Sequence, residues 1–225
     1  MIKVYKIFYS IQGEGVHQGV PMVFIRFAGC NMLPRCSYCD TSYAWDPQDG
    51  KDMDVPSIIE EIRILDSNYH KPWICITGGE PLWQSDGLVS LVRRLRKLGY
   101  HTTVETNGSF EVPKWYLLVH SWSADIKCPS SGVCGVSKAE WFNTRKQDQV
   151  KFVVSTKEDL DFTKKMIDKH ITGKPTILVS PAADADKEGN WNKEWLQEVA
   201  EFTKEIGVRF SLQVHKVIWG DIQGV

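Results

Sequence analysis

The sequence has no apolar run long enough to span a bilayer and no excess of either charge. Its 225 residues carry 27 Lys and Arg against 28 Asp and Glu, a formal net charge of −1. A transmembrane helix needs about 20 mostly apolar residues, and a balanced charge gives no electrostatic case for binding nucleic acid or an anionic membrane. The opening MIKVYKIFYS also lacks the apolar core and cleavage site of a signal peptide. We therefore expect a cytoplasmic protein with reduced cysteines.

The chain also lacks linkers, low-complexity segments and internal repeats, so we expect one domain over residues 1–225. Apolar, β-prone runs alternate with helical patterns along it. The patterns predict strands over residues 3–10, 22–27, 73–79, 101–106, 117–126, 149–155, 175–180 (with a loop to residue 186) and 209–214, and helices over 54–66, 87–98, 138–144, 157–170 and 191–206. This alternation predicts an α/β fold with a mostly parallel sheet. Periodicity alone leaves open a doubly wound sheet and a complete or partial barrel.

One loop carries the strongest chemical signal. FAGCNMLPRCSYCDTSYAWD, residues 27–46, follows a predicted strand and holds Cys30, Cys36 and Cys39. Three thiolates this close together can hold one soft metal ion or one iron–sulfur cluster. Structural zinc usually has four protein ligands, whereas three leave a coordination position open. Spacing alone does not separate zinc, with a distant fourth ligand, from an iron–sulfur cluster.

The remaining cysteines lie outside this loop. We expect Cys75 to pack in a core strand, because free cysteine is often a small buried hydrophobe. Cys128 and Cys134 are interpreted as loop thiols, with a second metal site as the alternative. Any of the three, or a His, would be the distant fourth ligand of a zinc ion.

Three further segments place polar groups near predicted strand ends. The glycines of IQGEG, residues 11–15, bracket Glu14 and permit close backbone approach, although the segment alone favours an ordinary turn. Arg26 lies within an apolar strand and therefore needs a salt-bridge partner or an anionic ligand. GGEP, residues 78–81, lies at a strand–helix junction, where parallel sheets present ligand-binding loops. Because most of these groups follow strands, we expect them to gather at the carboxyl edge of the sheet.

Together these motifs resemble the radical S-adenosylmethionine superfamily. Its cluster loop is similar to the three cysteines here, with Tyr38 between the last two, and its methionine-binding motif is similar to GGEP. More narrowly, IFYSIQGEG, FIRFAGCN, CSYCDT, TGGEPL, TVETNG and SLQVHK resemble the 7-carboxy-7-deazaguanine synthase family from the first predicted strand to the last. One departure is the five residues between Cys30 and Cys36, where the superfamily usually has three. It leaves the path of this loop open.

The resemblance implies a partial parallel β/α barrel that binds a [4Fe–4S] cluster through Cys30, Cys36 and Cys39. It implies S-adenosylmethionine as a second cofactor and Mg²⁺ at Thr41. The implied reaction converts 6-carboxy-5,6,7,8-tetrahydropterin to 7-carboxy-7-deazaguanine with loss of ammonia, toward the 7-deazapurine bases of tRNA. An electron donor such as flavodoxin or ferredoxin and a homodimer are implied as well, whereas no side chain is implied to act catalytically beyond the two cofactors.

The resemblance also implies two sets of binding residues. For S-adenosylmethionine they are Ser37, Tyr38, Asp40, Gly79, Glu80, Asp125, Ile126, Lys127, Val179, Ser180, Pro181 and Ala182. For the pterin they are Ile11, Gln12, Gly13, Glu14, Arg26, Thr77 and His215. In the second set, Glu14 is expected to accept from the guanidine-like edge of the ring and Arg26 to pair with the substrate carboxylate. The tail from Trp219 is expected to fold over this pocket.

Two other functions stay open. A different radical enzyme, such as an activase that takes hydrogen from a glycine of a partner protein, would share the cluster loop. It would have no need of Glu14, Arg26 and His215 as a small-molecule pocket. A non-catalytic binding module would use the cysteines only to hold a stabilising zinc ion.

Overall fold

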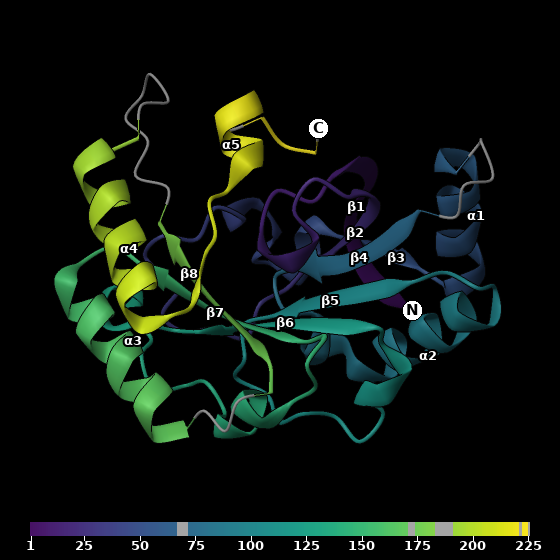
Figure 1. Cartoon of the computed structure of the whole chain (residues 1–225). Coiled ribbons are helices and arrows are strands. Elements are labelled where there is room, and N and C mark those ends of the chain that lie inside the picture. Colours follow the sequence, from purple (N-terminus) through teal and green to yellow (C-terminus); the bar gives the residue numbers. More distant parts are fainter. Residues whose placement is uncertain (67–71, 171–173, 183–190, 221, 225) are drawn as a thin grey trace.

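One curved sheet organises the chain in the computed structural model, which describes residues 1–66, 72–170, 174–182, 191–220 and 222–224 (Figure 1). Its strands are β1 (Ile2–Ile11), β2 (Pro21–Phe27), β3 (Lys51–Met53), β4 (Trp73–Gly78), β5 (Thr102–Thr106), β6 (Ser121–Ile126), β7 (Gln149–Val154), β8 (Thr176–Pro181) and β9 (Arg209–Phe210). The α-helices are α1 (Val55–Leu65), α2 (Ser85–Lys97), α3 (Lys157–His170), α4 (Lys193–Ile206) and α5 (Val214–Trp219).

Short 3₁₀ helices connect several of these elements. They are η1 (Gly15–His17), η2 (Ser42–Ala44), η3 (Pro47–Asp49), η4 (Pro81–Gln84), η5 (Tyr116–Leu118), η6 (Pro129–Ser131) and η7 (Ala139–Asn143). Among the described residues, no helix is long and apolar enough to cross a membrane.

The strand order shows that the sheet is open. Its order is β3-β1-β2-β4-β5-β6-β7-β8-β9, so β3 and β9 are its two edges within the described part of the chain. From β2 to β9 every pairing is parallel, whereas β1 is antiparallel to both of its neighbours. The sheet is therefore mostly parallel, as predicted, and it does not close into a full barrel.

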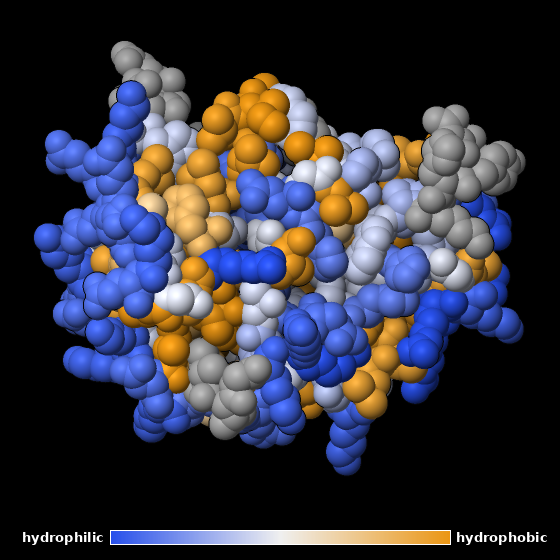
Figure 2. Space-filling model, in the orientation of Figure 1, coloured by the Kyte–Doolittle hydropathy of each residue, from blue (hydrophilic) through white to orange (hydrophobic). Residues whose placement is uncertain are grey.

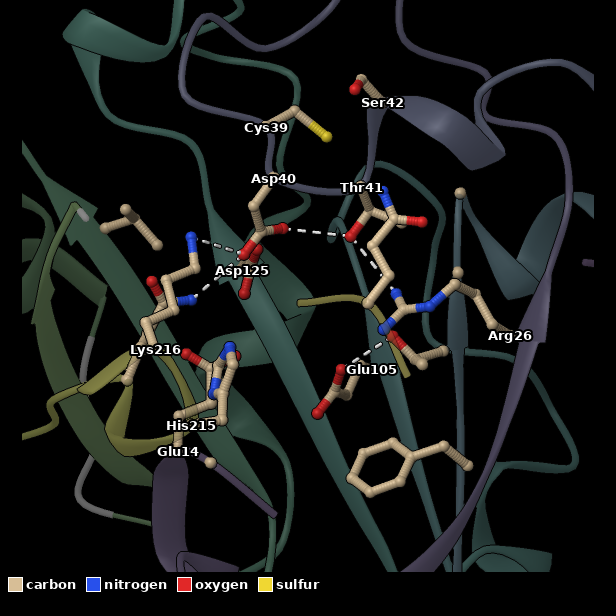
Figure 3. Close-up of a pocket in the computed structure, with 18 of the residues that line it drawn as sticks. Glu14, Arg26, Cys39, Asp40, Thr41, Ser42, Glu105, Asp125, His215 and Lys216 are labelled. Atoms are coloured by element: carbon tan, nitrogen blue, oxygen red, sulfur yellow. Dashed lines mark hydrogen bonds and ion pairs between the residues drawn. The ribbon is translucent and has the colours of Figure 1, made fainter. Parts of the chain in front are cut away.

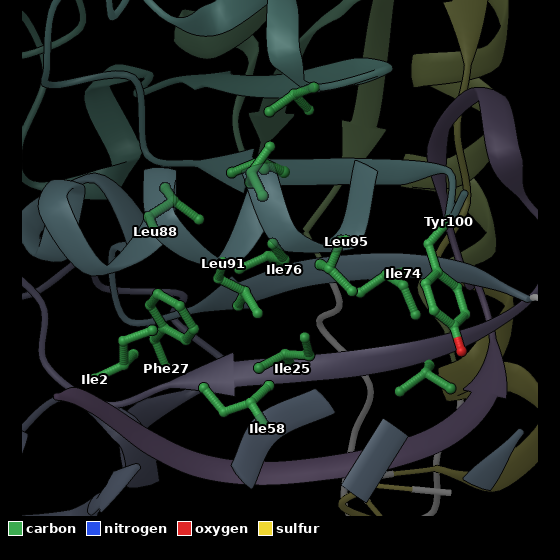
Figure 4. Close-up of a cluster of buried hydrophobic side chains, with 14 of the residues drawn as sticks. Ile2, Ile25, Phe27, Ile58, Ile74, Ile76, Leu88, Leu91, Leu95 and Tyr100 are labelled. Atoms are coloured by element: carbon green, nitrogen blue, oxygen red, sulfur yellow. The ribbon is translucent and has the colours of Figure 1, made fainter. Parts of the chain in front are cut away.

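Alternation along the strands separates two faces of the sheet, because successive side chains of a strand point to opposite sides. On β2, Ile25 and Phe27 join the core beneath α1 and α2 (Figure 4). Arg26 between them faces the other way and lines a pocket. The core residues of α1 and α2 recur at helical spacing, namely Ile58, Ile59, Ile62, Leu88, Leu91, Val92 and Leu95. The helices thus cover one face of the sheet and leave the other free to line a pocket.

A second core covers the other end of the same face. Phe152 and Val154 of β7 pack there with Val179 of β8, Leu160 of α3 and Val199 of α4. The helix ends follow sequence signals. At the start of α1, for example, Asp54 accepts a hydrogen bond from the backbone N–H of Ser57 at 2.9 Å, which is the role of an N-cap.

Most predicted elements are confirmed, but three predictions need correction and two elements were not predicted. The strand predicted over residues 117–126 begins only at Ser121, after η5, and the helix predicted over 138–144 is the 3₁₀ helix η7. The three-residue β3 was not predicted. The strand predicted over 209–214 ends at Phe210 and is followed by α5, which was also not predicted. The loop predicted to follow β8 lies mostly outside the described residues.

The last correction has a physical reason. The alternating pattern of RFSLQV is typical of a strand, but most of this segment contacts the loop after β1 instead. Ser211 Oγ accepts from the backbone N–H of Gly15 at 3.0 Å, and the Val214 N–H donates to the Gly13 carbonyl at 2.8 Å. These bonds draw the chain away from the sheet edge toward the loop after β1. Apolar side chains gather on the surface over α5, including the half-exposed Val217 and Ile218 (Figure 2).

Candidate active site

The face of the sheet opposite the helices lines a pocket of about 480 Å³. Five adjacent strands contribute polar residues to it, among them Arg26, Thr77, Glu105, Asp125 and Lys151. Figure 3 shows Arg26, Glu105 and Asp125 around this pocket. Arg26 is in register with Thr77, and Asp125 with Lys151. The pocket therefore follows the concave face of the sheet, across the strands.

The cysteine loop closes one end of this pocket. Cys30, Cys36 and Cys39 all line it, whereas the other three cysteines do not. Cys39 accepts from Trp45 Nε1 at 3.1 Å, and Arg35 Nη1 donates to the carbonyl of Cys30 at 2.6 Å. These bonds fix the path of the long loop.

The donor set of this loop fits a [4Fe–4S] cluster that keeps one iron open, because three soft sulfur ligands face one cavity. All six cysteines are free. Burial raises the pKa of the Cys30 and Cys36 thiols, and the charges of Arg35 and Lys127 respectively oppose that rise. Within the described ranges, no three His, Cys, Asp or Glu side chains converge as they would around a single metal ion. Cys75 and Cys128 are buried, and Cys134 is exposed.

The GGEP segment wraps around the start of the cysteine loop. The Gly79 N–H donates to the Phe27 carbonyl at 3.1 Å, and the Glu80 N–H donates to the Gly29 carbonyl at 2.8 Å. A Cβ atom on Gly79 would collide with the Gly29 carbonyl oxygen, so this close approach requires glycine. The two loops form one unit at the carboxyl ends of β2 and β4.

Glu80 anchors this unit from beneath the pocket. Its side chain is fully buried, and its carboxylate accepts from the N–H of Leu82 at 2.8 Å, Thr106 Oγ1 at 2.9 Å and the N–H of Asn107 at 2.7 Å. Desolvation outweighs these bonds and raises the pKa of Glu80 to about 7. The carboxylate of Glu80 is therefore held by hydrogen bonds within the protein, and Glu80 does not line the pocket.

An ion network crosses the floor of the pocket. Lys127 Nζ lies 2.8 Å from Asp125 Oδ2, and Lys151 Nζ lies 3.3 Å from Asp125 Oδ1 and 2.7 Å from Glu14 Oε1. Burial lowers the pKa of Lys127, but the carboxylate of Asp125 outweighs it, so the net shift is upward. The second oxygen of Glu14, Oε2, is buried without a hydrogen-bond partner in the described structure.

Arg26 and Thr41 lie together at the opposite wall (Figure 3). Arg26 Nη1 donates to Thr41 Oγ1 at 3.2 Å, and Thr41 Oγ1 donates to Asp40 Oδ1 at 3.0 Å. The guanidinium also lies over the ring of Tyr43, 5.7 Å from its centroid. Asp40 pairs with Lys216 at 3.1 Å, whereas Arg26 forms no ion pair with any carboxylate in the described part of the chain.

The C-terminal segment closes the pocket. His215 of α5 packs against Gly13, where any Cβ atom would collide with the imidazole ring. Burial lowers the pKa of His215, and the charges of Glu14 and Asp40 oppose this shift. Gly220, Ile222 and residues 223–224 also line the pocket, which agrees with the predicted fold-over of the tail.

One expectation about the sheet edge is only partly right. The cysteine loop, GGEP and Lys127 follow the carboxyl ends of parallel strands, as predicted. The QGEG loop lies at the other edge, because β1 is antiparallel and its end, Ile11, pairs with the start of β2 at Pro21. Glu14 therefore reaches the pocket from the side opposite the cysteines.

The structure brings most of the predicted binding residues to this one pocket. Those that line it are Ile11, Gln12, Gly13, Glu14, Arg26, Tyr38, Asp40, Thr41, Thr77, Gly79, Asp125, Lys127, Ala182 and His215, with the three cysteines. Those that do not line it are Ser37, Glu80, Ile126, Val179, Ser180 and Pro181. Ile126 and Val179 face the helix-covered core instead, and the Ser37 hydroxyl donates to the Ser130 carbonyl at 2.6 Å.

Sequence reasoning missed three charged residues of the pocket. Glu105 accepts from Gln12 Nε2 at 2.9 Å and from Thr77 Oγ1 at 2.7 Å. Lys151 and Lys216 complete the ion pairs described above. The signal that singled out Arg26, a charge within an apolar strand, was also present for Lys151 in QVKFVV, but not for Glu105 in the mostly polar HTTVET.

An open, mostly parallel barrel with three thiols at the carboxyl end of β2 defines an iron–sulfur enzyme of the radical S-adenosylmethionine type. Residues 11–112 match the model of a family described as a 4Fe-4S single cluster domain. A 7-carboxy-7-deazaguanine synthase of Methanospirillum hungatei is 38% identical over 220 residues, which cover 96% of this chain and 85% of that protein. One from Leptospira interrogans is 33% identical over 99% of this chain and 97% of that protein. The chain belongs to the 7-carboxy-7-deazaguanine synthase family.

A solved structure agrees with this fold. The crystal structure of QueE from Escherichia coli is similar with a TM-score of 0.70, covering 95% of this chain and 94% of that chain at 22% identity. At this identity the similarity shows a shared fold.

Proposed function

We propose that the chain converts 6-carboxy-5,6,7,8-tetrahydropterin to 7-carboxy-7-deazaguanine with loss of ammonia, in the biosynthesis of the 7-deazapurine tRNA bases queuosine or archaeosine. The observation that carries this proposal is a single pocket shared by three free thiols with Glu14, Arg26 and His215. Its volume of about 480 Å³ is in the range of small-molecule sites.

The cofactor end of the pocket is supported by the thiols and by the end of β6. When bound, a [4Fe–4S] cluster with S-adenosylmethionine supplies the radical that abstracts hydrogen from the substrate, while the protein supplies position and shields the site from water. Cys30, Cys36 and Cys39 would hold the cluster. Gly79, Asp125 and Lys127 would hold the second cofactor by backbone and charged groups, beside the buried and unpartnered hydroxyl of Tyr38.

The substrate end is supported by two groups that are only partly paired within the described residues. Among the described residues no carboxylate lies within ion-pair distance of Arg26, so its guanidinium is available to the carboxylate of a pterin. Glu14 Oε2 is buried and unpaired, so it is available to the N–H donors on the guanidine-like edge of the ring. Thr77 and Gln12 are held by Glu105, and His215 covers the QGEG loop, so all of these side chains are positioned before the substrate binds.

A magnesium ion at Thr41 is part of the proposal. Thr41 Oγ1, 3.0 Å from Asp40 Oδ1, would offer the ion a hard oxygen ligand beside a carboxylate. Arg26 now donates to the same hydroxyl. For Mg²⁺ to bind Thr41, the guanidinium of Arg26 would therefore have to turn away toward the substrate carboxylate.

The test is an anaerobic assay of reconstituted protein with the tetrahydropterin, S-adenosylmethionine, a reductant and Mg²⁺. We expect the deazaguanine product, detected by mass spectrometry, and its absence under these conditions contradicts the proposal. A stable complex with a large glycyl-radical protein would favour an activase instead. Stoichiometric zinc without iron or sulfide would favour a zinc-stabilised binding module. Flavodoxin or ferredoxin as the electron donor, a homodimer, and a cytoplasmic location remain predictions.

A further inference from the structure

Lys151 lines the pocket between Glu14 and Asp125, although neither the motifs nor the resemblance assign it a role. It occupies the middle of β7, with 8% of the residue exposed, and it faces away from the helix-covered core. Its ammonium pairs with two carboxylates, Glu14 at 2.7 Å and Asp125 at 3.3 Å. Burying a lysine this deeply is costly unless its charge is compensated, and the two carboxylates supply that compensation. A charged group buried at such a cost calls for a role.

The two carboxylates belong to different parts of the proposed site. Asp125 pairs through its other oxygen with Lys127 at 2.8 Å, at the proposed cofactor end. Glu14 lies at the proposed substrate end, on a loop 137 positions from Lys151 in the sequence and beyond four intervening strands of the sheet. The QGEG loop therefore reaches across the concave side of the sheet to β7, where Lys151 links the two ends.

Strand β7 holds the QGEG loop at two points. Gln149 and Lys151 are two residues apart and so share one face of the strand. Gln149 Oε1 accepts from the backbone N–H of Val16 at 2.8 Å, while Lys151 holds Oε1 of Glu14. Glu14 is thus fixed in both backbone and side chain, with Oε2 left buried and unpaired.

We propose that Lys151 is a positioning residue that holds one oxygen of Glu14 so that the other is presented to the N–H donors of the pterin ring. This inference rests on the proposed function. Burial lowers the pKa of Lys151, but the charges of Asp125 and Glu14 raise it by more than burial lowers it. The pKa therefore lies well above its usual value, and the ammonium stays charged.

The charge balance of the pocket supports the same role. Its lining carries four carboxylates, Glu14, Asp40, Glu105 and Asp125, and four cations, Arg26, Lys127, Lys151 and Lys216. Removing the charge of Lys151 leaves Glu14 without its cation. Its Oε1 would then have no partner to hold it, so the carboxylate could turn and Oε2 would no longer be presented to the N–H donors of the ring.

Two variants test this role in the reconstituted holoenzyme. Lys151→Met removes the charge and retains an unbranched chain, whereas Lys151→Arg retains the charge. We expect Lys151→Met to raise the KM and the calorimetric Kd for the tetrahydropterin by about 10- to 100-fold, the range for losing one charged hydrogen bond. Lys151→Arg should stay within about 5-fold of the wild type. Iron content and visible absorbance serve as the folding control, and Lys151→Gln replaces Lys151→Met if the latter loses its cluster.

A double-mutant cycle distinguishes positioning of Glu14 from a general structural role. In a Glu14→Gln background, Lys151→Met should change the pterin Kd by less than about 3-fold, because the oxygen it positions is already gone. An equal effect in both backgrounds, or an unchanged Kd in Lys151→Met alone, would overturn the inference while leaving the proposed function in place. A wild-type protein that neither binds nor converts the pterin would overturn both.

Discussion

Replacing Glu80 with Gln is expected to destabilise the fold at low pH but not at high pH. The carboxylate is fully buried and accepts from Leu82, Thr106 and Asn107. A Gln amide can keep its oxygen toward Leu82 and Thr106, but its NH₂ group then faces the Asn107 N–H. One buried donor loses its acceptor, which costs about 2 kcal/mol.

The pH dependence follows from the raised pKa of Glu80. A carboxyl whose pKa rises on folding contributes stability that is present below its ordinary pKa and is lost as the pH rises through the folded value. Between the ordinary 4.5 and about 7, the shift corresponds to about 3 kcal/mol. The wild type therefore loses most of this contribution between about pH 5 and pH 8, whereas the Gln variant has no such term. The advantage of the wild type should fall by about 2 to 3 kcal/mol across that range.

Urea unfolding under reducing conditions, followed by tryptophan fluorescence, measures this difference. Histidines and other carboxyls titrate in both proteins and cancel when the two pH curves are subtracted. A difference that is constant from about pH 5 to about pH 8 would refute the reasoning, because it would show that the three hydrogen bonds keep Glu80 ionised throughout.

Three further predictions concern the pocket. Cys36→Ala should lose the visible absorbance of the cluster, whereas the exposed Cys134→Ala should keep it; equal spectra would exclude Cys36 as a ligand. Arg26→Met should raise the pterin KM by about 10- to 100-fold with cluster content unchanged, because one charge-assisted pair is lost, and collapse of the cluster would show that Arg26 is structural. Thr41→Val should remove any stimulation of turnover by Mg²⁺, and undiminished stimulation would place the ion elsewhere.

Strands, helices and the cysteine loop were predictable because their signals are local. Apolar, β-prone runs marked β2, β4 and β7, and Asp54 with Pro56 marked the start of α1. The orientation of β1 was not predictable, because alternation carries no strand direction. As a result, the placement of Glu14 at the edge opposite the cysteines could only come from the structure.

The site residues also differed in how far local sequence could predict their contacts. Arg26 was predicted to need a partner or ligand, and the structure leaves it without a carboxylate partner among the described residues. Glu80 was assigned to the cofactor by its motif, but its carboxylate is satisfied by groups that are close only in three dimensions. Lys151 was overlooked because its partners, Glu14 and Asp125, lie far from it in the sequence.

The most direct test of the account is the state of the three thiols in anaerobically reconstituted protein. Iron and sulfide analysis should give about four of each per chain. The electron paramagnetic resonance spectrum of the reduced cluster should change when S-adenosylmethionine is added, because one iron is not held by cysteine. Stoichiometric zinc with no iron, or a cluster spectrum that S-adenosylmethionine leaves unchanged, would contradict the account.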